Sequence, residues 1–275
     1  MTAKNHEGTW EGYKKLLLPM GHKADVNNLT TLSSIIVDRK EGKVNFLHVM
    51  EEGKYSHLPQ EWRVGSKRVT ESHHIMMRKG LKSERSIVTS SSILDGILEE
   101  AEKKDTDGIV LGWGPKPKSS ISKLISKIMS RANCDVIVFK TRNDPAETKN
   151  IVYPVAREPN QGRLKLISRI MADTDSSLTF VHVTDRSDKN QKQGKEVLKK
   201  SVARANKTGI ESETMITYGN DVSEKLSEIS RDYDLMILGP SGGWWLTRTL
   251  FGHLTDKIAS RVNCSVLLHK NYDEE

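Results

Sequence analysis

Four short segments of this 275-residue chain occur twice, in the same order and about 130 residues apart. Such a duplication predicts two domains of one architecture, because a repeat of this length can bury a core of its own. The matched segments are KKLLLP at 14–19 with NIVYP at 150–154, VNFLHV at 44–49 with LTFVHV at 178–183, DTDGIVLG at 105–112 with DYDLMILG at 232–239, and RANCDVIVFK at 131–140 with RVNCSVLLHK at 261–270.

Each copy alternates short apolar runs with segments of helical periodicity. The first copy predicts strands at 14–19, 43–49, 86–89, 108–111 and 135–140. Between them we expect a helix capped by Asp25, a polar loop from 51 to about 65 and then a helix to Lys79, a helix starting at Ser91 or Ser92, and a helix over 121–132. This alternation is typical of a parallel sheet covered on both faces. The fold class is therefore α/β, with two tandem doubly wound, mostly parallel five-stranded sheets.

The boundaries follow from the repeat. We expect an N-terminal extension over 1–13, a first domain over 14–141, a linker over 142–149 and a second domain over 150–275. The linker is polar and contains Asp144-Pro145, a pair that favours a turn.

Composition narrows the cellular setting. No apolar run approaches the ~18 residues of a membrane-spanning helix. The first residues, MTAKNHEGTW, lack the apolar centre of a secretory signal. The only cysteines, Cys134 and Cys264, precede strand-like runs, so we expect inert core thiols in a reducing cytoplasm. The net charge of +7 suits an anionic partner, whether nucleic acid or the cytoplasmic leaflet of a membrane, and equally a solvated lysine-rich exterior.

The segment 234–255, DLMILGPSGGWWLTRTLFGHLT, is the strongest candidate for a ligand site. An apolar strand leads into a glycine-rich turn and then a helix, an arrangement that presents backbone N–H groups to a phosphate. A glycine loop kept only for its turn geometry would look the same. The candidate residues for a nucleotide such as ATP are Gly239, Ser241, Gly242, Gly243, Gly252, His253 and Thr255.

Trp244 and Trp245 lie within that loop. Two adjacent tryptophans favour an adenine-stacking surface or an anchor in a protein interface. The alternative is one buried ring and one ring on the domain surface.

The matched segments resemble tandem domains of the universal stress protein family. The resemblance rests on the strand ending in Pro, on LHV or VHV, on the VLG or ILG strand with its loop, and on NC before the last strand. It implies that such domains pair within or between chains. It also implies ATP binding where the glycine spacing is followed by Ser or Thr, but here His253 follows Gly252.

Two further departures weaken the nucleotide site. The family's Pro-x-Asp carboxylate, which holds the ribose, is replaced by Gly21 in the first domain and by Ala156 in the second. Losing that charge-assisted hydrogen bond costs about 1.5–3 kcal/mol. In the first domain the loop 112–126 lacks the later glycine, and Pro115 and Pro117 have no N–H to donate.

The run 83–114, with IVTSSSILDG and IVLGWG, is similar to the cytoplasmic C-terminal domains of prokaryotic cation–chloride cotransporters, in the amino acid–polyamine–organocation superfamily. This similarity implies a non-catalytic regulatory and dimerisation domain of a secondary transporter. The implied partners are a second copy, the membrane domain of a parent transporter and an anionic membrane surface. The alternative is a free-standing cytoplasmic tandem stress protein that binds ATP in its second domain.

Other chemistry finds little support. His57, His73 and His74 lack the spacing of metal ligands, and no hydrolase or Walker-type motif occurs, so we expect neither a metal nor an enzyme. Aromatic residues do not alternate with lysines, which argues against nucleic acid. His48 and His182 are matched by the repeat, which predicts a shared structural role.

Overall fold

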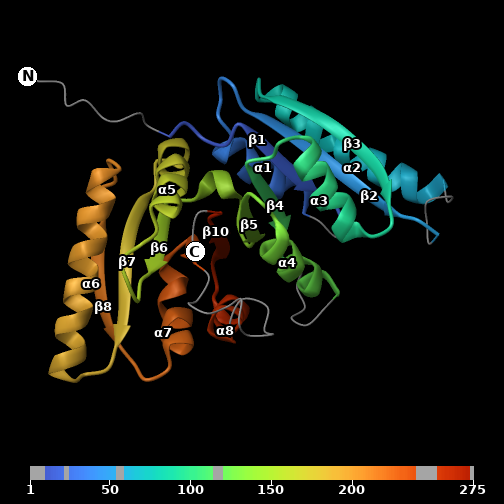
Figure 1. Cartoon of the computed structure of the whole chain (residues 1–275). Helices are drawn as coiled ribbons and strands as arrows, with labels where there is room; N and C mark the ends of the chain where they lie inside the picture. The colour runs from blue at the N-terminus through green and yellow to red at the C-terminus, as the bar shows by residue number, and fades with distance from the viewer. Residues whose placement is uncertain (1–9, 22–24, 54–58, 114–119, 240–252, 273–275) are drawn as a thin grey trace, which may run out of the picture.

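The computed structural model of the chain describes residues 10–21, 25–53, 59–113, 120–239 and 253–272. Its ten strands form one sheet, in the order β3-β2-β1-β4-β5-β10-β9-β6-β7-β8 (Figure 1). In the first repeat the elements are β1 (Lys15–Pro19), α1 (Val26–Ile36), β2 (Lys43–Glu51), α2 (Pro59–Arg78), β3 (Lys82–Ser90), α3 (Ile93–Lys103), β4 (Gly108–Gly112), α4 (Ser120–Arg131) and β5 (Asp135–Lys140).

The second repeat has the same succession. Its elements are β6 (Asn150–Pro154), α5 (Gln161–Thr174), β7 (Ser177–Thr184), α6 (Asp188–Lys207), β8 (Glu213–Tyr218), α7 (Val222–Ile229), β9 (Leu235–Leu238), α8 (His253–Arg261) and β10 (Ser265–Lys270). Within each repeat the strands are parallel, as the α/β class predicts. None of the described helices combines the length and apolar character needed to cross a bilayer.

The two five-stranded halves join edge to edge. β5 and β10 pair antiparallel, with Leu267 opposite Phe139 and Leu268 opposite Val138. The predicted pairing of stress-protein-like domains is therefore present within this one chain, and the two sheets are continuous. The domain boundaries expected from the sequence stay a prediction.

Alternation along the buried strands builds a core on each face of the sheet. Leu16 and Leu18 of β1 point into a core that also contains residues of α1, α2, α5 and α6. Leu17 points to the opposite core, with residues of α3, α4, α7 and α8. Each core contains buried side chains of both repeats, so the halves share their packing as well as their sheet.

A buried polar cluster lies where the repeats meet. It also includes Tyr13, two residues before the start of β1. The Tyr13 hydroxyl donates to Asp135 at 2.7 Å, and His269 Nε2 lies 3.0 Å from the same carboxylate oxygen. The other oxygen accepts from the Asn271 amide and the Tyr272 backbone N–H. Burial opposes ionisation of Asp135, but its hydrogen bonds with His269, Tyr13 and Tyr272 prevail and lower the pKa of the carboxyl. We call these residues the seam cluster.

Two elements differ from the sequence predictions. Helix α2 begins at Pro59, before the expected end of the loop near residue 65, and proline suits a first helical turn. Strand β3 runs from Lys82 to Ser90 instead of 86–89. It is an edge strand and only partly buried, so its first half carries polar side chains that do not look like a buried strand in the sequence.

Candidate functional site

In a doubly wound sheet, ligands bind at the carboxyl ends of the strands where the strand order reverses. In the second repeat this point lies between β6 and β9, which are neighbours in the sheet. Pro154 ends β6, and Gly239 follows β9. Gly239, the first residue of the predicted glycine-rich segment, therefore lies at the expected place for a ligand.

The space beside Gly239 is filled by Arg163, in the first turn of α5. A Cβ added to Gly239 would lie 2.7 Å from Cζ of Arg163 and 2.8 Å from both of its terminal nitrogens. Arg163 is 3% exposed. It donates to the Tyr153 hydroxyl and to the carbonyl of His269, each at 2.9 Å, and its Cζ lies 5.9 Å from the centroid of the Tyr153 ring. The guanidinium thus closes one side of Gly239 to any ligand.

The first repeat places an apolar side chain at the equivalent position. A Cβ on Gly112, the last residue of β4, would lie 3.0 Å from Cδ1 of Leu29 in α1. In both repeats a helix side chain packs against the glycine at the carboxyl end of the fourth strand. Close packing is therefore sufficient to explain a glycine at these two positions.

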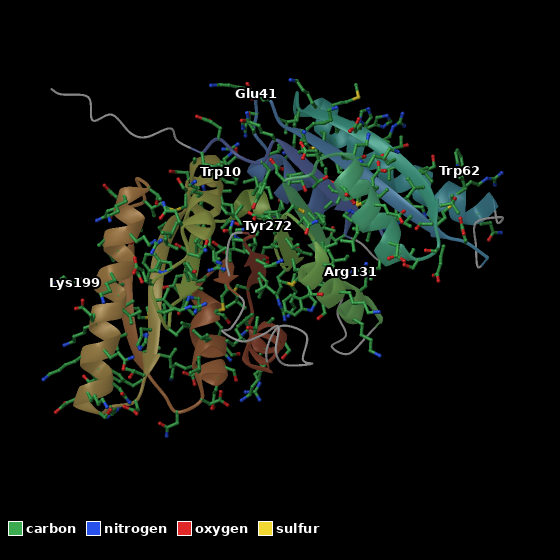
Figure 2. All side chains as sticks on the ribbon, in the orientation of Figure 1. Trp10, Glu41, Trp62, Arg131, Lys199 and Tyr272 are labelled. Atoms are coloured by element: carbon green, nitrogen blue, oxygen red, sulfur yellow. The ribbon has the colours of Figure 1, made fainter. Side chains whose placement is uncertain are left out.

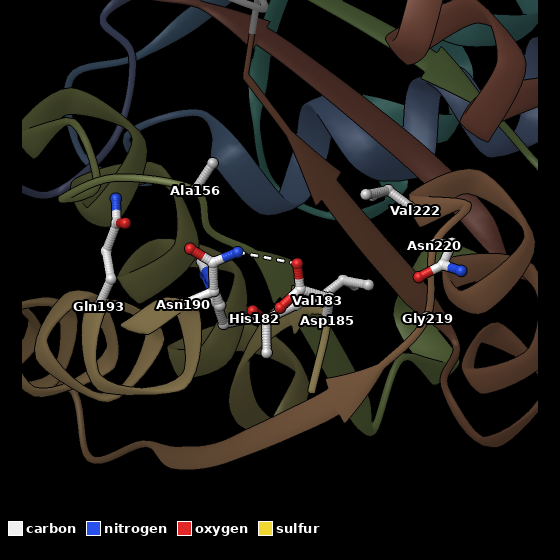
Figure 3. A pocket seen from close by; sticks show the side chains of 10 residues that line it. Ala156, His182, Val183, Asp185, Asn190, Gln193, Gly219, Asn220 and Val222 are labelled. Atoms are coloured by element: carbon white, nitrogen blue, oxygen red, sulfur yellow. Dashed lines mark hydrogen bonds between the residues drawn. The ribbon is translucent and has the colours of Figure 1, made fainter. Parts of the chain in front are cut away.

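The two positions that would carry the ribose carboxylate lie in open surroundings. A Cβ on Gly21 would meet no atom of the described residues within 4 Å. Ala156 lines an open cavity of about 460 Å³ at the carboxyl ends of β6, β7 and β8 (Figure 3). The cavity is lined by Ala156, His182, Val183, Thr184, Asp185, Asn190, Gln193, Gly219, Asn220 and Val222.

The carboxylate that lines this cavity, Asp185, is hydrogen-bonded within its own loop. Asp185 accepts hydrogen bonds from the Ser187 hydroxyl and backbone N–H and from the Asn190 amide, the last drawn in Figure 3. These bonds, that of the Ser187 hydroxyl first, lower the pKa of Asp185. Its described hydrogen bonds hold the β7–α6 turn, so Asp185 does not simply replace the carboxylate that Ala156 lacks.

His182 has a structural role, and His48 has the equivalent role in the first repeat. Nδ1 of His182 lies 2.7 Å from the carbonyl of Val155, and Nδ1 of His48 lies 3.1 Å from that of Met20. Each ring packs on a helix glycine, Gly194 or Gly65, where a Cβ would come within 2.6 Å or 2.1 Å of it. The two histidines make the same contacts in both repeats, in line with their matched positions.

Most of the predicted nucleotide residues lie outside the described residues, namely Ser241, Gly242, Gly243 and Gly252, together with Trp244 and Trp245. His253 begins α8, whose described side chains include Thr255, buried at 4% exposure. Of the predicted set the structure therefore places Gly239, the backbone of His253 and Thr255, and the site as a whole stays a prediction.

Two basic side chains of α8 are held by an acidic cap. Lys257 Nζ lies 2.6 Å from Asp221, which caps α7, and Arg261 lies 3.7 Å from the same carboxylate. The hydrogen bonds from Lys257 and Ser223 hold the pKa of Asp221 well below its usual range. A matching pair, Arg131 with Asp95 at 3.8 Å, joins α4 to α3. These cations stabilise helix pairs in both repeats.

The two cysteines and His73 are placed as structural side chains. Burial raises the pKa of Cys134 to about 12 and that of Cys264 to about 11, so neither thiol ionises near neutral pH. His73 Nδ1 lies 2.8 Å from the Ser83 hydroxyl, and His57 lies outside the described residues. Across the described ranges, no cluster of three or more histidines, cysteines and carboxylates is placed to hold a metal ion.

Sequence reasoning missed Arg163 and the seam cluster. Arg163 belongs to no motif, and its contacts come from β6 and β10, residues far apart in the chain. The available signal is the repeat itself, because the alignment of the matched segments puts His269 at the position of Phe139 and so marks the exchange of an apolar residue for a polar one.

Comparison with known proteins identifies the family of this fold. The model of the universal stress protein family matches residues 12–140 and again 147–270. The crystal structure of a universal stress protein from Archaeoglobus fulgidus has a TM-score of 0.63 and 17% identity, covering 98% of this chain and 100% of that one. The cytoplasmic domain of a prokaryotic cation chloride cotransporter also has a TM-score of 0.63, with 13% identity and coverage of 97% and 98%. At such identities the likeness to these structures concerns the fold.

Two antiporters are similar in sequence. The Na(+)/H(+) antiporter NhaS5 of Synechocystis sp. is 23% identical over an alignment of 180 positions that covers 62% of this chain and 26% of the antiporter. The cation/H(+) antiporter 7 of Arabidopsis thaliana is 25% identical over an alignment of 296 positions that covers 87% of this chain and 37% of that protein. The chain thus spans less than half the length of either relative.

Proposed function

The chain belongs to the universal stress protein family, and from that premise we propose that it is a non-catalytic regulatory and assembly domain of a secondary cation transporter. The observation that carries the proposal is the similarity of 87% of the chain to part of a cation/H(+) antiporter. The fold of a cotransporter's cytoplasmic domain agrees with it. The domain would lie at the cytoplasmic face of the membrane, next to the transporter's membrane domain.

The residues around Gly239 and Ala156 favour a scaffolding function over the binding and turnover of a nucleotide. Ala156 leaves the ribose without its carboxylate, and Arg163 covers one side of Gly239. A domain of this kind regulates transport by making different contacts in different transporter states, which changes the populations of those states.

Cross-linking in native membranes tests the proposal. We expect lysines of this chain to cross-link to, or to lie on one polypeptide with, a polytopic cation transporter. Recovery of the chain only from the soluble fraction, with no transporter peptide attached, would contradict it.

We propose further that the domain is a homodimer. β5 and β10 already pair within the chain, so a dimer has to use another surface. The sheet ends at β3 and β8, and α2, beside β3, exposes Trp62 and Met77. Light scattering over a range of concentrations should show a dimer. A strict monomer at high concentration would exclude this part of the proposal.

The competing function is ATP binding by a free-standing stress protein. It is favoured by the spacing of Gly239, Gly242 and Gly252 and by the cavity beside Ala156. Tight binding of ATP that is abolished by Gly242→Asp would support this function.

A further inference from the structure

Helix α6 has a large local excess of basic over acidic residues. α6 carries seven basic residues and two acidic ones, a net +5 in a chain whose net charge is +7. The helix lies at the outer edge of the molecule beside β8, with Lys199 on its outer side (Figures 1 and 2). Its basic residues are Lys189, Lys192, Lys195, Lys199, Lys200, Arg204 and Lys207.

Most of these lysines have no acidic partner. Lys200 lies 3.9 Å from Glu196, and Arg204 lies 2.7 Å from Glu158. Among the described residues, no carboxylate comes within 4.0 Å of the other five, which are all exposed. Lys192, Lys195 and Lys199 are spaced by three and four residues, so they form one stripe along the helix. Like charges at this spacing repel each other, and an anionic surface would relieve that repulsion.

The fold itself does not require this stripe. α2 takes the place of α6 in the first repeat and covers the same face of the sheet. It carries four basic and two acidic residues, a net +2. Lys67 of α2 lies 3.8 Å from Glu71. The excess of unpaired lysine is therefore a property of α6 and not of its position in the fold.

The stripe borders an apolar groove. Lys195 and Lys199 stand beside a groove of about 350 Å³ between α6 and β8, which is also lined by Leu198, Val202, Thr214 and Ile216. β8 is the last strand of the sheet, so the groove lies at its edge. Lysine ammonium groups can pair with the phosphates of an anionic phospholipid, and the apolar residues of the groove can contact its ester region. Nucleic acid offers the phosphates but leaves the apolar floor without a partner.

We propose that the α6–β8 face binds the surface of an anionic phospholipid membrane through Lys192, Lys195 and Lys199. This inference rests on the proposed function for the presence of a membrane beside the domain. It orients the domain with α6 along the bilayer surface and leaves the β3 edge, at the other end of the sheet, for a second copy.

Sedimentation of the full chain with vesicles tests this. We expect binding to phosphatidylglycerol mixed with phosphatidylcholine, little binding to phosphatidylcholine alone, and a steep loss of binding with added salt. Each lysine near an anionic surface strengthens binding about fivefold. The variant with Lys192→Gln, Lys195→Gln and Lys199→Gln should therefore bind about a hundredfold more weakly.

The matched control removes the same charge elsewhere. Lys40, Lys67 and Lys79 are exposed in the first repeat, and their change to Gln should preserve most of the binding. Equal losses in the two variants, displacement by soluble glycerol phosphate, or tighter binding to duplex DNA at equal phosphate concentration would each overturn the inference. The vesicles contain no transporter, so a negative result here leaves the cross-linking test of the proposed function intact.

Discussion

At the scale of single residues, Arg163 and Gly239 show that close packing alone can require a glycine at a motif position. The guanidinium is anchored by Tyr153 and the His269 carbonyl and presses on the backbone where a Cβ would stand. Leu29 does the same at Gly112. A glycine in the position of a phosphate loop therefore does not by itself indicate a phosphate.

Gly239→Ala should destabilise the protein. The new methyl group would displace a buried, hydrogen-bonded guanidinium, and overpacking of this kind costs about 1–3 kcal/mol of unfolding free energy. Gly21→Ala is the control, since its methyl group would meet no atom within 4 Å in the part of the chain that the structure describes. Denaturant unfolding measures both. Equal stability of the two variants would show that the Arg163 contact is not restrictive.

Asp135→Asn should lower stability at neutral pH by about 1.5–3 kcal/mol, because a buried ionised acceptor is lost from the seam cluster. The folded-state pKa of Asp135 is lowered, so its ionised form contributes stability above the unfolded value of about 3.9. That contribution is lost as the pH falls through the folded-state pKa. The stability curves of wild type and variant should therefore converge in acid, and parallel curves would refute the assignment.

At the scale of elements, helix caps set where several helices begin. The Asn160 side chain accepts from the backbone N–H of Arg163 at the start of α5, whereas Ser187 makes no capping bond to α6. Asn160→Ala should cost about 1 kcal/mol. Ser187→Ala should cost less, because it removes only an exposed hydrogen bond to Asp185 and no cap of α6. Urea titrations of the two variants compare them directly. A larger loss for Ser187→Ala would contradict this assignment of the caps.

The elements that sequence predicts well are those with a local signal. Asp25 and Ser92 cap α1 and α3 as expected, since an N-cap bond spans only three residues. The first half of β3 lacks such a signal because an edge strand is only partly buried. The start of α2 was misplaced because its first turns expose their side chains, among them Trp62 and Val64.

The candidate site was predictable only in part. The place where Gly239 leaves the sheet follows from the strand–turn–helix pattern. Arg163 and the seam cluster depend on contacts across about 100 residues or more of sequence, which no local pattern encodes.

At the scale of the whole molecule, the continuous sheet and shared cores predict that the repeats unfold together. Leu267→Ala in β10 should cost about 2–5 kcal/mol and accelerate amide exchange in β4 of the first repeat as well as in β9. Hydrogen exchange followed by mass spectrometry resolves the two. Acceleration confined to β9 would show that the repeats are independent folding units.

We propose that the duplicated fold serves as a scaffold and not as a nucleotide site. Calorimetric titration of the full chain with ATP and magnesium tests it most directly. We expect no saturable heat up to about 1 mM ATP, a limit near −4 kcal/mol of binding free energy. Stoichiometric binding at micromolar ATP, abolished by Gly242→Asp, would contradict it.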